Sequence, residues 1–63
     1  MNIYHLEILF GEKIAKRQVE ADIIGWAEAG LYEFVKFSNT GEREVVAYYP
    51  VSKTIISKIQ YNI

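Results

Sequence analysis

Eight carboxylates and one histidine are the side chains of this 63-residue chain that suit acid–base chemistry. Such catalysis needs two of these groups held in a cleft that pushes their pKa values apart. The spacing marks no pair, and a chain this short has little wall for a pocket of about 300 Å³ or more. We therefore interpret the carboxylates as solvated surface charges: Glu7, Glu12, Glu20, Asp22, Glu28, Glu33, Glu42 and Glu44.

His5 lies close to Glu7 in the sequence, but no serine or cysteine nucleophile motif accompanies it. A surface histidine is therefore the interpretation that we adopt. The four glycines are isolated rather than gathered in a phosphate-binding loop. The chain has no cysteine and only one histidine, which removes the usual zinc ligand sets. We expect no enzyme activity, no cofactor and no metal.

A different chemistry is the stacking of nucleic-acid bases on exposed aromatic side chains, helped by basic residues that contact phosphates. The basic candidates are Lys16, Arg17 and Lys36. The net charge of −1 counts against this hypothesis, because nucleic-acid binders are more often clearly basic. A single-strand-binding small barrel is therefore the alternative function, and steep salt dependence of binding would be its mark.

The composition predicts one folded domain over residues 1–63. It is 51% hydrophobic, 14% aromatic and 24% charged, which argues against disorder. No apolar run reaches the length of a membrane span, and the first residues lack the pattern of a signal peptide. We expect a cytoplasmic protein that does not enter a membrane.

The clearest local signal is a β-hairpin over residues 31–49. Two runs rich in aromatic and β-branched residues, 31–37 and 44–49, flank a polar loop. Asn39 and Gly41 tolerate a positive φ, so we place the turn there. Both faces of this hairpin carry large apolar groups, whereas a sheet with one solvated face should alternate more cleanly.

Residues 12–29 are open to two interpretations. As a helix, apolar residues fall on one side at spacings of three to four, and Gly30 would end it. As strands, apolar and polar residues alternate up to Asp22, with a bend at Asp22 or Gly25. Gly25 and the β-branched Ile23–Ile24 pair favour the strands.

The remaining elements are a first strand over residues 3–10 and a last strand over residues 54–61, with Pro50 ending the strand before it. Short connections favour a meander in which each strand pairs with its predecessor. The predicted fold is all-β: an antiparallel meander of about five strands, forming a curled sheet or a half-open barrel. The alternative is an α+β fold with one helix at residues 12–29.

About two-thirds of the chain resembles short β-meander proteins of bacteria and their phages, many of which have no assigned function. The resemblance rests on residues 19–22, Gly30, Phe34, residues 46–50 and Ile55. These positions are mostly structural, so the resemblance supports the strands and implies no site. It implies a phage-encoded or accessory protein that modulates a host protein.

The surplus of apolar side chains predicts a non-enzymatic interaction protein that forms a dimer or binds another protein. A small domain without disulfides gains stability from such association. The predicted interface residues are Trp26, Val35, Phe37, Val45, Ala47 and Tyr49.

Overall fold

The computed structural model describes residues 1–62 apart from the side chain of Ala27. It contains six strands and two short 3-10 turns: β1 (Asn2–Phe10), β2 (Lys13–Ala21), β3 (Ile23–Ala27), η1 (Glu28–Gly30), β4 (Leu31–Phe37), β5 (Arg43–Pro50), η2 (Val51–Lys53) and β6 (Thr54–Gln60). The all-β prediction is confirmed. The alternative helix at residues 12–29 is wrong, because this region forms β2 and β3. Within residues 1–62, no helix is long and apolar enough to cross a membrane.

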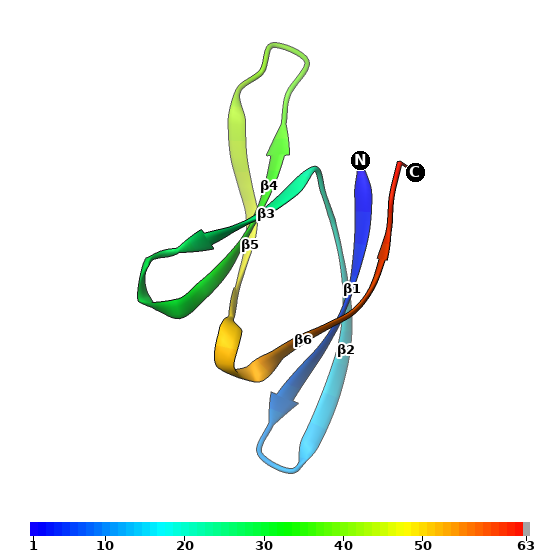
Figure 1. The fold of residues 1–63 in the computed structure, drawn as a ribbon, viewed down its shortest axis with the longest axis vertical. Coiled ribbons are helices and arrows are strands. Elements are labelled where there is room, and N and C mark those ends of the chain that lie inside the picture. Colours follow the sequence, from blue (N-terminus) through cyan, green and yellow to red (C-terminus); the bar gives the residue numbers. More distant parts are fainter. Residues whose placement is uncertain (63) are drawn as a thin grey trace.

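The strands form two three-stranded antiparallel sheets (Figure 1). The first sheet has the order β2-β1-β6, and the second has the order β3-β4-β5. The last strand, β6, pairs with the first strand and not with its predecessor β5. A single meander of about five strands is therefore not confirmed. The two sheets lie side by side, and the two termini lie close together at one end of the first sheet (Figure 1).

Asp22 forms the corner between the two sheets. It is the one residue that separates β2 from β3, so a nearly continuous strand leaves one sheet and enters the other. Its backbone N–H donates to the carbonyl of Val35 over 2.8 Å, and its Oδ2 accepts the N–H of Phe37 over 2.8 Å. Its own carbonyl accepts from Asn2 Nδ2 over 3.1 Å. The predicted bend at Asp22 or Gly25 lies at Asp22.

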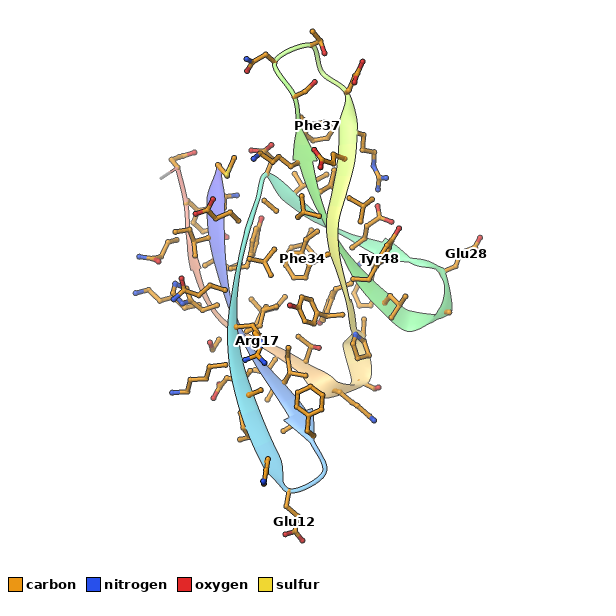
Figure 2. All side chains as sticks on the ribbon, turned by 180° about the vertical axis from the view of Figure 1, so that it is seen from behind. Glu12, Arg17, Glu28, Phe34, Phe37 and Tyr48 are labelled. Carbon is orange, nitrogen blue, oxygen red and sulfur yellow. The ribbon has the colours of Figure 1, made fainter. Side chains whose placement is uncertain are left out.

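The core lies between the inner faces of the two sheets. As the alternation predicts, Tyr4, Leu6 and Ile8 of β1 point into it. Phe34 of β4 is fully buried and meets Tyr4 and Tyr49 edge to face, with ring centroids 5.4 and 5.9 Å apart. Figure 2 shows Phe34 in the middle of the molecule. The side chains that complete the core, or pack against it, are Val19, Ala21, Ile24, Tyr32, Ala47, Ile56 and Ile59.

A bulge in each sheet shifts the alternation of one strand. In β5, Phe34 pairs with Ala47 but Val35 pairs with Val45, so Val46 is an extra residue. In β6, Ser57 is the extra residue between the partners of His5 and Leu6. The bulge at Val46 places Ala47 and Tyr49 against the core, so their predicted position on an outer face is corrected.

The bulge in β5 gives neighbouring tyrosines opposite roles, which predicts opposite effects of the same substitution. Tyr49→Ser removes a ring that packs on Phe34 and should cost about 2–4 kcal/mol of unfolding free energy. Tyr48→Ser alters a side chain that is 54% exposed and should cost well under 1 kcal/mol. Urea unfolding of both variants measures this, and equal losses would contradict the assigned faces.

The corner predicts a second effect on stability. Asp22→Ala leaves the Phe37 N–H without its carboxylate acceptor, and a hydrogen bond to a charged group contributes about 1.5–3 kcal/mol. We expect a loss of that size in thermal or urea unfolding. Glu20→Ala, an exposed acidic residue two positions earlier, is the matched control and should change stability little.

Candidate interaction surfaces

The outer face of the second sheet carries an apolar cluster. Val35 follows Phe34 in β4 and so points to the face opposite the core, where Ile23 and Val45 are its cross-strand partners. Val35 is nevertheless 0% exposed, so the chain itself covers it and a partner cannot reach it. Its predicted role as an interface residue is corrected on this ground. Phe37 is exposed and Val45 is half-buried, so both stay available.

A salt bridge crosses this sheet close to that cluster. Arg43 of β5 pairs with Glu33 of β4, two residues before Val35. The Glu33 side chain is mostly buried and the Arg43 side chain is about half exposed. A partly exposed pair of this kind contributes about 0–1 kcal/mol, so it adds more to the charge pattern of the face than to stability.

The hairpin of β3 and β4 projects beyond the core. Trp26 lies near its end and is 76% exposed, and its ring centroid lies 5.4 Å from that of Tyr32. The turn that follows begins with the exposed Glu28. Figure 2 shows Glu28 at the end of this hairpin, on the side of the molecule away from the first sheet. We call residues 26–28 the hairpin tip.

The first sheet has a hollow of about 470 Å³ across its three strands. The side chains that point to its outer face are His5 and Glu7 of β1, Lys16 and Gln18 of β2, and Lys58 of β6. Leu6, Arg17 and Ser57 also line it. Lys16 and Lys58 lie on the two edge strands, so their ammonium groups flank the central strand. We call this site the basic hollow.

His5 and Ser57 are neighbours in the basic hollow, but they do not form a nucleophile and base. The Ser57 hydroxyl donates to the backbone carbonyl of His5 over 3.2 Å, not to the ring. His5 Nε2 lies 2.6 Å from Oε1 of Gln60, an acceptor, so the ring nitrogen donates there. Nucleophilic catalysis needs a hydroxyl hydrogen-bonded to the base, so this geometry gives the pair no catalytic role.

The residues predicted to bind nucleic acid are not brought together. Lys16 lies in the basic hollow, and Arg17 Nη1 folds back to the carbonyl of Lys16 over 2.8 Å. Lys36 lies in β4 of the second sheet, where Glu44 of β5 is its cross-strand neighbour in the register. The exposed aromatic rings of Trp26, Phe37 and Tyr48 are also in the second sheet, whereas the exposed ring of Phe10 is at the end of β1. Of the three predicted basic residues, Lys36 shares a sheet with Trp26, Phe37 and Tyr48, and Lys16 and Arg17 do not.

The sequence pattern does not reveal the basic hollow, because unbroken alternation over residues 54–61 would place Ile56, Lys58 and Gln60 on one face. The bulge at Ser57 separates them, with Ile56 against the core and Lys58 beside His5. A signal was present: Ile56 and Ile59 are three residues apart, and two core positions of one strand fit that spacing only around an extra residue.

Within residues 1–62, no group of three or more histidine, aspartate or glutamate side chains is placed to hold a metal ion. Comparison of the chain with protein families, curated proteins and solved structures finds no match.

The turn that supports the hairpin tip carries a strained residue. Ala29 has φ 63° and ψ 28°, in the left-handed region that costs a residue with a Cβ about 1–2 kcal/mol. We expect Ala29→Gly to raise the unfolding free energy by about 1 kcal/mol in urea titrations. Gly30→Ala, at φ 69°, should lower it by a similar amount, and the same sign for both would contradict the turn geometry.

Proposed function

We propose that this chain is a non-enzymatic interaction protein whose first partner is a second copy of itself. The observation that supports this is the exposure of large apolar side chains, led by Trp26 at 76%. Tryptophan is the residue type most often found as an energetic anchor of protein interfaces. Phe10, Ile14, Tyr48 and Ile55 are also more than half exposed.

The size and shape of the chain support the same proposal. Its accessible surface is 4581 Å², against about 4,200 Å² for an average folded monomer of this mass. Its radius of gyration is 12.1 Å, where a compact chain of this length has about 10–11 Å. A standard interface buries about 800 Å² on each partner, which this surface can supply. Association would therefore recover burial that a single small domain lacks.

The alternative partner is a different protein. The resemblance to phage meander proteins suggests a host protein in the cytoplasm, and the same exposed surfaces would serve it. Single-stranded nucleic acid is a weaker alternative, because two of the three predicted basic residues, Lys16 and Arg17, lie in the first sheet, whereas Trp26, Phe37 and Tyr48 lie in the second.

The test is the solution mass of the wild-type chain across a dilution series, by light scattering after size exclusion. We expect at least twice the monomer mass of 7.3 kDa at low micromolar concentration. A monomer mass at every concentration would contradict self-association and turn the search to a different protein partner.

A further inference from the structure

The hairpin tip combines two features within three residues. Trp26 offers a large apolar ring that the rest of the chain leaves uncovered, and Glu28 offers an exposed carboxylate. Figure 2 shows Glu28 on the side of the molecule away from the first sheet, so its carboxylate cannot reach the basic hollow of its own chain.

The outer face of the first sheet has the complementary pattern. Lys16, Arg17 and Lys58 supply three positive charges at the basic hollow, and Glu7 supplies one negative charge. Next to the hollow, the same face carries the exposed apolar residues Leu9, Ile14 and Ile55. Lys16 and Ile14 lie two residues apart on one strand face, about 7 Å, so a charged and an apolar contact are close neighbours there.

We propose that the hairpin tip of one copy docks into the basic hollow of a second copy. The Glu28 carboxylate faces Lys16 and Lys58, and the Trp26 ring packs on the neighbouring apolar residues Ile14 and Leu9. The hollow of about 470 Å³ lies within the range of about 300–1,000 Å³ that binding pockets occupy, so it has room for the tip. This inference rests on the proposed self-association and names its contact surfaces.

The proposed contact is heterologous, because a tip meets a hollow rather than another tip. Since the two surfaces lie on different sides of the molecule, a docked pair keeps one free tip and one free hollow. Such contacts form rings when the rotation closes and open chains when it does not. The mass should therefore exceed that of a dimer at high concentration.

The test uses two variants that each lose one half of the contact. Trp26→Ser removes the ring of the tip and keeps the hollow. The second variant, Lys16→Gln with Lys58→Glu, changes the net charge of the hollow from positive to negative and keeps the tip. Glutamine is chosen at position 16 because a carboxylate there would lie directly across from Glu7 and repel it. The affinity of self-association should fall by about tenfold or more in each variant alone, because a few anchor residues supply most of the binding energy of an interface.

Mixing the two variants is the decisive measurement. One intact tip and one intact hollow remain, so the mixture should form a one-to-one dimer and nothing larger. Adding Glu28→Lys to the hollow variant gives that chain a positive tip and a negative hollow. The tip of one copy and the hollow of another then carry opposite charges again, so this variant should regain self-association. Glu12→Lys, the same charge change at the β1–β2 turn, is the matched control and should behave as wild type.

Three results would overturn the docking. Variants that associate as strongly as wild type, or a mixture that stays monomeric, would exclude the tip and hollow while leaving self-association in place. In that case Phe37→Ser with Tyr48→Ser would identify the outer face of the second sheet instead. A monomeric wild type would remove both the docking and the proposed self-association. Circular dichroism of each variant checks that its strand content is unchanged.

Discussion

The hydrogen bonds of Asp22 hold the corner at which the chain passes from the first sheet into the second. A chain of 63 residues cannot close a core with one flat sheet, because one face of that sheet would stay in water. The bend at Asp22 folds one long strand into both sheets, and its N–H and carboxylate both bond to the backbone of β4. Phe34 lies within that same strand, so the corner fixes the position of the ring on which the core is built.

The two bulges extend the same constraint along the sheets. One adds Val46 to β5 and the other adds Ser57 to β6, and a bulge increases the local twist of its strand. The bulge in β6 also changes which residues share a face: Ile56 packs against the core, and Lys58 lies beside His5 at the basic hollow. One extra residue in β6 therefore affects both the core and the surface.

The sequence carries most of the secondary structure, because alternation, turn residues and Pro50 report on local geometry. The first strand, the last strand, the 31–49 hairpin and the inward face of Tyr4, Leu6 and Ile8 follow from those signals. The same signals leave residues 12–29 open between strands and a helix, and the bend open between Asp22 and Gly25. The faces of β5 and β6 do not follow from the sequence pattern, because period-two reasoning assumes an unbroken alternation. The extra residues Val46 and Ser57 interrupt that alternation. Pairing of β6 with β1 is a long-range contact, which local patterns do not specify. Trp26 was expected at a surface and is exposed, whereas Ala47 and Tyr49 were assigned outward and face the core.

The four edge strands differ in how they resist unwanted strand addition. Lysine, proline and bulges are the devices that proteins use to protect sheet edges from aggregation. β2 carries Lys13 and Lys16, β6 carries Lys58 and a bulge, and β5 carries a bulge and ends at Pro50. β3 has none of these devices: its five residues, Ile23–Ala27, include no charge. The shortness of β3 is what limits the addition of a strand from another molecule at this edge. Lengthening β3 would therefore create a site for edge-to-edge aggregation.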